Sequence, residues 1–261
     1  MKMLYKVTGA GKPLVLVPGG LTGWIGWDGH VKLLSASRKI IQVQLLNVQY
    51  GFENRPLPVG YSVKMESQAL SSALDELGIV SPVDIAAWSY GALTTLDYAL
   101  DNQERIRSLT LIEPPAMWVL HKSNMMDTAA LENEKMLSTL SGDITEKKLE
   151  EFLCAVGFCP PGQQARNLPQ WPIWLQYRQA LRNSPAVIAH TDELSRLQSF
   201  QKPVLLVKGT GSATFLHQII EIFAERLPHA RVTEMPAGHA PHIVSMDTFL
   251  SQMKAFQESV A

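Results

Sequence analysis

Short apolar, β-rich runs alternate with helical patterns along most of this 261-residue chain. Such continuous apolar runs are typical of strands buried on both faces of a sheet. Apolar residues also repeat at helical spacing over 65–77 and 215–227. The alternation predicts an α/β fold with a mostly parallel central sheet and helices on both faces. The predicted strands lie at 14–17, 40–46, 83–87, 109–112, 204–207 and 231–235.

The alternation stops over 116–200, where helical patterns and prolines replace the next expected strand. Prolines at 160, 161 and 169 interrupt this stretch, which predicts several short helices joined by turns. We interpret it as a helical cap inserted into one core domain. The predicted domain bounds are 1–115 and 201–261 for the core and 116–200 for the cap.

Aromatic side chains gather in one short piece of the predicted cap, at Trp171, Trp174 and Tyr177. They have two interpretations. They pack the cap against the core, or they form an apolar roof over a ligand. We treat Trp171 and Trp174 as candidate substrate-binding residues.

The charge balance argues against large anionic partners. The formal net charge is -1, and no cluster of lysine and arginine interrupts that balance, so we expect neither nucleic acid nor a membrane surface as a partner. A small, apolar, uncharged substrate fits better. No stretch approaches the roughly 20 apolar residues of a membrane helix, and the first residues lack a signal-peptide core, so we expect a cytoplasmic protein. The oligomeric state stays open, with a homodimer as one alternative.

The two cysteines, Cys154 and Cys159, lie five residues apart in a predicted helical segment. This spacing matches neither a redox pair with two intervening residues nor a four-ligand zinc site, so we expect buried free thiols. The histidines show no metal-ligand spacing. We therefore predict no metal and no cofactor.

A serine stands at the junction between the predicted strand 83–87 and a helix-forming run. The sequence at 87–91 reads Ala-Trp-Ser-Tyr-Gly. A sharp turn of this kind presents a nucleophilic serine and requires small residues two positions before and after it, which Ala87 and Gly91 provide. Such a string also occurs by chance. Its place between a strand and a helix favours Ser89 as a nucleophile.

A serine hydroxyl is a weak nucleophile at neutral pH and needs a base within hydrogen-bond reach. His239 is the best candidate, because it follows the last predicted strand and so lies at the same edge of the sheet as Ser89. His242 competes with it. Its neighbour Ile243 opens a helical apolar pattern, which favours a packing or supporting role for His242.

A glycine-rich loop follows the first predicted strand, with the sequence Pro-Gly-Gly-Leu-Thr-Gly at 18–23. Attack on a carbonyl creates an oxyanion that needs preorganised N–H donors, and we expect these from Gly20 and from Tyr90. Leu21 is a candidate contact for the substrate. The loop lacks the Gly-Lys-Ser/Thr ending of a phosphate loop, and taken alone it could be a plain turn.

The sharp turn around Ser89 and the Gly-His pair at 238–239 resemble motifs of the α/β-hydrolase superfamily. The chain resembles this superfamily over nearly its whole length. The resemblance implies the chain order nucleophile, acid, histidine. In that superfamily the acid usually follows the strand after the cap, but Ser212 occupies this place, and no aspartate lies between 202 and 231. Some members carry the acid before the cap instead. That position is Glu113, for which a surface or capping glutamate is the alternative.

Within the superfamily the chain is most similar to lactone hydrolases that open a resorcylic macrolactone such as zearalenone. Those enzymes carry a Ser-His-Glu triad with the glutamate before the cap. The similarity rests on segments 17–21, 111–115 and 171–174. Because a cap tryptophan packs on the substrate in that group, the resemblance implies a binding role for Trp174.

Together these expectations describe a serine hydrolase that cleaves an ester or lactone of a bulky apolar substrate through an acyl-enzyme. Two alternatives stay open. One is a C–C hydrolase, lyase or cofactor-free dioxygenase on the same scaffold, and the other is a receptor-like binding protein with little turnover. A haloalkane dehalogenase is disfavoured, because its nucleophile is a carboxylate and position 89 is serine.

Overall fold

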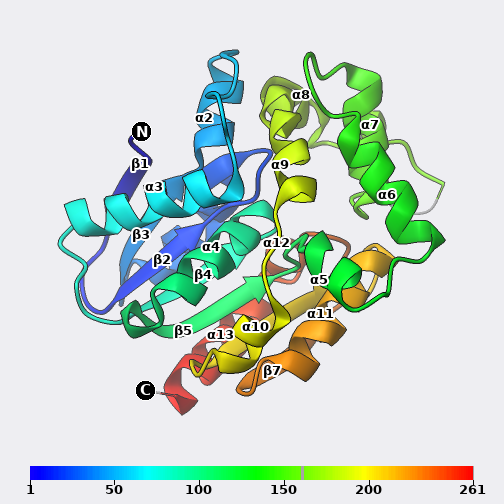
Figure 1. Ribbon diagram of the computed structural model, residues 1–261. Coiled ribbons are helices and arrows are strands. Elements are labelled where there is room, and N and C mark those ends of the chain that lie inside the picture. Colours follow the sequence, from blue (N-terminus) through cyan, green and yellow to red (C-terminus); the bar gives the residue numbers. More distant parts are fainter. Residues whose placement is uncertain (160–161, 261) are drawn as a thin grey trace.

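The computed structural model in Figure 1 describes residues 1–159 and 162–260. Seven strands form one sheet in the order β1-β3-β2-β4-β5-β6-β7. β1 pairs antiparallel with β3, and the other pairs are parallel. The predicted α/β fold with a mostly parallel sheet is therefore confirmed. The strands are β1 (Leu4–Thr8), β2 (Pro13–Val17), β3 (Lys39–Gln44), β4 (Val83–Trp88), β5 (Ile106–Ile112), β6 (Val204–Gly209) and β7 (Ala230–Met235).

Helices cover both faces of the sheet because successive strand residues point to opposite sides. Leu14 and Leu16 of β2 belong to one apolar cluster, whereas Val15 and Val17 belong to another. The first cluster includes side chains of α1 (Asp28–Leu34) and α13 (Met246–Ser259). The second includes side chains of α3 (Val63–Glu76), α4 (Tyr90–Asp101) and α11 (Thr214–Arg226).

The strand order reverses between β2 and β4. After β2 the chain moves to β3 on one side, and it then crosses to β4 on the other side. Ligands of open α/β sheets bind in the crevice that such a reversal leaves at the carboxyl ends of the strands. The glycine-rich loop after β2 and Ser89 after β4 both begin at this crevice.

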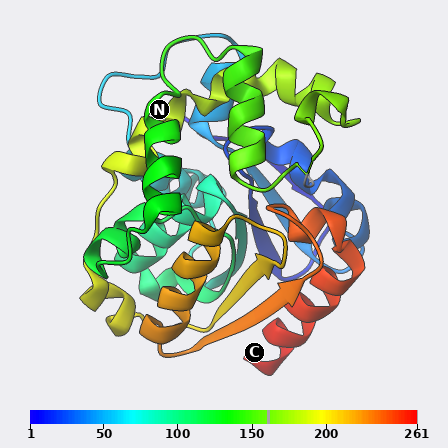
Figure 2. The same ribbon diagram turned by 90° about the vertical axis from the view of Figure 1, so that its right-hand side faces the viewer.

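The segment between β5 and β6 is helical. In Figures 1 and 2 its middle helices gather at one end of the molecule, beyond the sheet. Pro160 and Pro161, which were expected to interrupt this stretch, lie outside the described residues. Its helices are α5 (Met117–Lys122), α6 (Thr128–Ser138), α7 (Glu146–Ala155), α8 (Trp171–Tyr177), α9 (Ser184–Ala189) and α10 (Leu194–Ser199), with 3-10 turns η3 (Ala165–Asn167) and η4 (Arg178–Asn183).

The structure differs from the sequence prediction at three strands. The strand expected over 40–46 ends at Gln44, and the helix α2 (Leu46–Phe52) begins two residues later. The antiparallel strand β1 was not predicted. β7 is not buried on both faces, because it lies at the edge of the sheet and leaves Arg231, Val232 and Glu234 exposed.

The expectation of buried free thiols is wrong. Cys154 is exposed, Cys159 is half-buried, and the two form a disulfide. The chain turns at the end of α7, where Gly157 adopts a φ of 88°, and this brings the two Cα atoms to 4.8 Å. Across the residues that the structure describes, no helix has the length and apolarity to span a membrane.

Candidate active site

Ser89 lies in a strained turn between β4 and α4. Its φ of 53° and ψ of -124° are uncommon for a residue with a side chain. Its N–H donates to the carbonyl of Ile112 on β5, at 2.8 Å. A Cβ atom at Gly91 would lie 2.1 Å from the carbonyl oxygen of Pro18, so the loop after β2 requires glycine two positions after the serine. The tight turn holds the Ser89 hydroxyl at the edge of the sheet.

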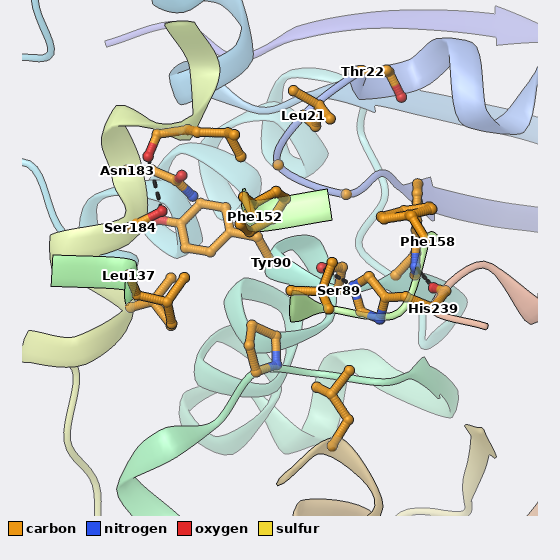
Figure 3. Close-up of a pocket in the computed structure, with 18 of the residues that line it drawn as sticks. Leu21, Thr22, Ser89, Tyr90, Leu137, Phe152, Phe158, Asn183, Ser184 and His239 are labelled. Atoms are coloured by element: carbon orange, nitrogen blue, oxygen red, sulfur yellow. Dashed lines mark hydrogen bonds between the residues drawn. The ribbon is translucent and has the colours of Figure 1, made fainter. Parts of the chain in front are cut away.

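Ser89, His239 and Glu113 form a hydrogen-bonded line. The Oγ atom of Ser89 lies 2.8 Å from Nε2 of His239, and Nδ1 of His239 lies 2.7 Å from Oε2 of Glu113. Figure 3 shows the contact between the serine and the histidine. Since an ionised carboxylate only accepts, Nδ1–H donates to Glu113 and Nε2 accepts from the serine hydroxyl. The structure thus brings together the three residues that the sequence singled out.

Glu113 follows β5 directly and is fully buried. Its φ of 44° is again uncommon for a residue with a side chain. Its second oxygen, Oε1, accepts a hydrogen bond of 2.7 Å from the N–H of Gly209, the last residue of β6. Both carboxylate oxygens therefore have donors, which offsets the cost of burying the charge. The end of β6 supplies a backbone donor to the acid, while Ser212 is not part of this line.

The backbone of His239 is held on two sides. Its carbonyl accepts a hydrogen bond of 2.7 Å from Nε1 of Trp88, and its N–H donates to the carbonyl of Gly157 at 3.4 Å. The ring of Phe158 meets the imidazole edge-on, with centroids 5.4 Å apart. The loop after α7 therefore contributes directly to the position of the histidine.

An apolar pocket opens beside the serine, with an empty volume of about 670 Å³ that includes the part open to solvent. Much of its wall comes from the helical segment between β5 and β6. That wall includes Leu137, Phe152, Val156, Phe158, Trp174 and Val187. Such a lining favours apolar ligands, with a few polar groups to orient them.

Four of the predicted contact residues line this pocket: Gly20, Leu21, Tyr90 and Trp174. Trp171 is not among the lining residues. It lies at the start of α8, is half-buried and packs against the apolar core, as in the packing alternative considered for it. Tyr90 is the first residue of α4, so its N–H is one that the helix leaves without an internal acceptor.

Phe158 and Asn183 are among the pocket residues that the sequence analysis missed. Figure 3 shows Asn183 beside the ring of Tyr90, and Phe158 beside His239. Both come from the segment between β5 and β6, where no motif fixes the spacing to the core. A lone asparagine or phenylalanine there gave no sequence signal that could have found them.

A family comparison matches residues 14–251 to the alpha/beta hydrolase family. The chain belongs to that family. It is 23% identical over 268 residues to Lipase 1 of Psychrobacter immobilis, covering 98% of this chain and 80% of the lipase. It is 28% identical over 257 residues to the pimeloyl-[acyl-carrier protein] methyl ester esterase of Aeromonas hydrophila, covering 95% of this chain and 96% of the esterase. A solved hydrolase from Pseudomonas aeruginosa superposes with a TM-score of 0.76 at 21% identity, covering 97% and 93% of the two chains, and shares the fold.

In this α/β hydrolase His242 is a packing residue. It is fully buried, its ring lies 4.7 Å from those of Trp27 and Trp88, and it stacks on His30 at 5.4 Å. Nε2–H of His30 donates to the carbonyl of His242 at 2.9 Å. Burial holds the pKa of His242 well below its ordinary value and lowers the pKa of His30 to about 4. Both rings therefore stay neutral at neutral pH.

This histidine pair predicts a loss of stability in acid. The unfolded chain protonates His30 near pH 6.5, whereas the folded chain does so only near pH 4. At His30 the unfolded state thus binds more protons, so the contribution of His30 to the free energy of unfolding should fall by on the order of 3 kcal/mol as the pH drops across this window. Urea unfolding between pH 7 and pH 4 measures this. His30→Gln should flatten the pH dependence, while the exposed His229→Gln should not; equal slopes in all three proteins would contradict the prediction.

Within the described residues, no group of three or more histidine, cysteine, aspartate or glutamate side chains is arranged to hold a metal ion.

Proposed function

We propose that this α/β hydrolase cleaves a carboxylic ester or lactone of a bulky apolar substrate, with Ser89 as nucleophile, His239 as base and Glu113 as the acid of the triad. The observation that carries the proposal is the hydrogen-bonded line of these residues, with distances of 2.8 Å and 2.7 Å, which opens into an apolar pocket. A serine with a base in reach, and a base oriented by a third group, is the arrangement that activates hydroxyl nucleophiles.

The reaction has two steps. Oγ of Ser89 attacks the acyl carbon while Nε2 of His239 takes its proton, and the imidazolium then gives that proton to the leaving alkoxide. Water attacks the resulting acyl-enzyme with His239 again as base, which releases the acid and restores the serine. The N–H groups of Gly20 and Tyr90 donate to the oxyanion that forms in each step. Glu113 keeps the histidine in the correct tautomer and stabilises the imidazolium.

The substrate class follows from the pocket wall. We take the helices α5 to α10 as a cap over Ser89, and the cap side chains that line the pocket are mostly apolar. Trp174 supplies a flat aromatic surface to the substrate. The position of the acid at Glu113, before the cap, keeps macrolactones among the candidate substrates.

A panel of p-nitrophenyl esters of increasing acyl length, small lactones and a macrolactone tests the proposal. We expect turnover with esters or lactones and a kcat/KM that rises with apolar bulk, since each buried methylene contributes about 0.8 kcal/mol of transfer free energy. A burst of p-nitrophenol equal to the enzyme concentration would support the acyl-enzyme. Turnover of a vinylogous diketone without any esterase activity would point to C–C cleavage. Binding of apolar ligands without turnover would point to a receptor-like protein.

A further inference from the structure

Glu66 is a fully buried carboxylate outside the proposed triad. It lies on α3, and three donors surround it. Its oxygens accept from the N–H groups of Leu46 and Asn47, at 2.9 Å and 2.8 Å, and from the hydroxyl of Tyr61, at 2.7 Å. Burial raises the pKa of Glu66 to about 7, while the three hydrogen bonds act in the opposite direction. An acid in such a place is costly unless its hydrogen bonds are used.

One branch leads from Glu66 to Gly20. Leu46 and Asn47 are the first residues of α2, whose first N–H groups lack partners within the helix, so Glu66 caps α2 from a different helix. The capped residue Asn47 then donates its side-chain Nδ2 to the carbonyl of Gly20, at 2.7 Å. Gly20 carries one of the two proposed oxyanion donors. The carboxylate therefore fixes the glycine-rich loop through a single intervening residue.

The other branch leads from Glu66 to Tyr90. The hydroxyl of Tyr61, which donates to Glu66, lies 2.9 Å from the hydroxyl of Tyr90. The side chain of Asn183 lies beside the ring of Tyr90 (Figure 3). Tyr90 carries the second proposed oxyanion donor. Both proposed donors, one in the loop after β2 and one at the start of α4, thus connect to one carboxylate.

The two branches meet in a tightly packed place. A Cβ atom at Gly20 would lie 3.0 Å from Cβ of Tyr90, 3.2 Å from Nδ2 of Asn183 and 3.3 Å from Nδ2 of Asn47. In addition, Oδ1 of Asn47 is buried without a hydrogen-bond partner in the described part of the chain. An unpaired buried oxygen costs free energy, so a residue that served packing alone would be better without it. The hydrogen bond that Nδ2 donates to Gly20 therefore explains why asparagine occupies position 47.

We propose that Glu66 is a positioning residue that preorganises the oxyanion hole, acting through Asn47 on Gly20 and through Tyr61 on Tyr90. This inference rests on the proposed function. Oxyanion donors contribute most when they are fixed before charge develops, and the loop that carries Gly20 contains no helix or strand to fix it. Glu66 replaces that missing support.

Glu66→Gln tests the inference. Its amide can accept at one oxygen, but its NH₂ group faces a donor, so at least one of the three hydrogen bonds is lost. We expect kcat for a p-nitrophenyl ester to fall by about 10- to 100-fold, less than when an oxyanion donor is removed outright, with KM changed by less than about threefold. The affinity for a boronic acid, which forms a tetrahedral anionic adduct with the serine, should fall in parallel. Affinity for an unreactive amide analogue should not.

Three variants complete the design. Glu76→Gln is the matched control, because Glu76 lies on the same helix and its contacts with Lys2 and Tyr5 are at the surface. Tyr61→Phe and Asn47→Ala each interrupt one branch, and each should give a smaller loss of kcat with the same selectivity for the boronic acid. If Glu66→Gln does not fold, Tyr61→Phe and Asn47→Ala test the inference instead, by the change in kcat and by the change in affinity for the boronic acid.

The inference is overturned if the variants keep kcat within about twofold of the wild type, or if kcat falls without a parallel loss of boronic acid affinity. The second result would indicate general loosening of the structure. A wild-type protein that neither hydrolyses esters nor reacts with a fluorophosphonate would overturn both this inference and the proposed function. An active wild type with unaffected variants would overturn this inference alone.

Discussion

Ser89→Ala should lower kcat for ester hydrolysis by about 10⁶-fold, because it removes the atom that forms the acyl-enzyme. The methyl group fits where the hydroxymethyl group lay, so the free energy of unfolding should change little. The strain of the turn stays, because alanine has to adopt the same φ of 53°. A discontinuous assay with long incubation can follow this range of rates.

Fluorophosphonate labelling followed by peptide mass analysis gives the second measurement. The wild type should carry one adduct, on Ser89, and Ser89→Ala should carry none. Ser72→Ala is the control, since Ser72 is an exposed serine on α3 that donates to the carbonyl of Gln68. Labelling that persists in Ser89→Ala would assign the nucleophile to another residue.

Glu113→Gln should lower kcat by about 10³- to 10⁴-fold with little change in KM. Glutamine can occupy the same volume and still accept from Gly209 through its carbonyl oxygen. Its NH₂ group, however, would then face Nδ1 of His239, and it can only donate. The imidazole is driven into the tautomer with its proton on Nε2, which cannot accept from Ser89.

The matched control is Glu134→Gln, because Glu134 forms the other glutamate–histidine contact of the molecule that the structure describes, with His121 at 3.0 Å near the surface. That variant should retain wild-type kcat. Thermal unfolding should show Glu113→Gln folded at the assay temperature. Near-normal turnover in a folded Glu113→Gln protein would remove Glu113 from the mechanism.

The sheet could be predicted because its central strands are continuous apolar runs, which are typical of strands buried on both faces. The same reasoning is weaker at the edges. β1 was missed because four of its five residues are exposed and only Tyr5 is half-buried. β7 was predicted, but its expected burial on both faces is wrong, because only Met235 of this strand is buried. The prediction of a strand through Leu45 and Leu46 was wrong for another reason. Its apolar residues continue the pattern of β3, and only the carboxylate of Glu66, twenty residues away, favours a helix start there.

The line of Ser89, Glu113 and His239 could be assembled from sequence because each residue follows a predicted strand. Parallel strands bring their carboxyl ends to one edge, so three local motifs become neighbours. The support behind the oxyanion hole could not be assembled in this way. Glu66 lies within an amphipathic helix and Tyr61 precedes it, and neither position differs in pattern from an ordinary surface residue.

The disulfide could not be predicted either, because its formation depends on the turn after α7 and not on spacing alone. The same holds for Phe158, which that turn places against His239. Both examples lie in the helical segment between β5 and β6. There the chain has no sheet to impose a register, so tertiary packing decides which residues face the core.

The proposed nucleophile, Ser89, and the proposed acid, Glu113, lie at the ends of adjacent, hydrogen-bonded strands, and the N–H of Ser89 donates to the carbonyl of Ile112, the residue immediately before Glu113. Their separation is therefore as stiff as the sheet ladder itself. His239, in contrast, lies in the loop between β7 and α12 (Pro241–Val244), where its backbone forms hydrogen bonds with Trp88 and Gly157. The 236–240 loop is therefore the part of the proposed Ser-His-Glu line least fixed by the sheet, and engineering aimed at temperature adaptation of the rate should begin there.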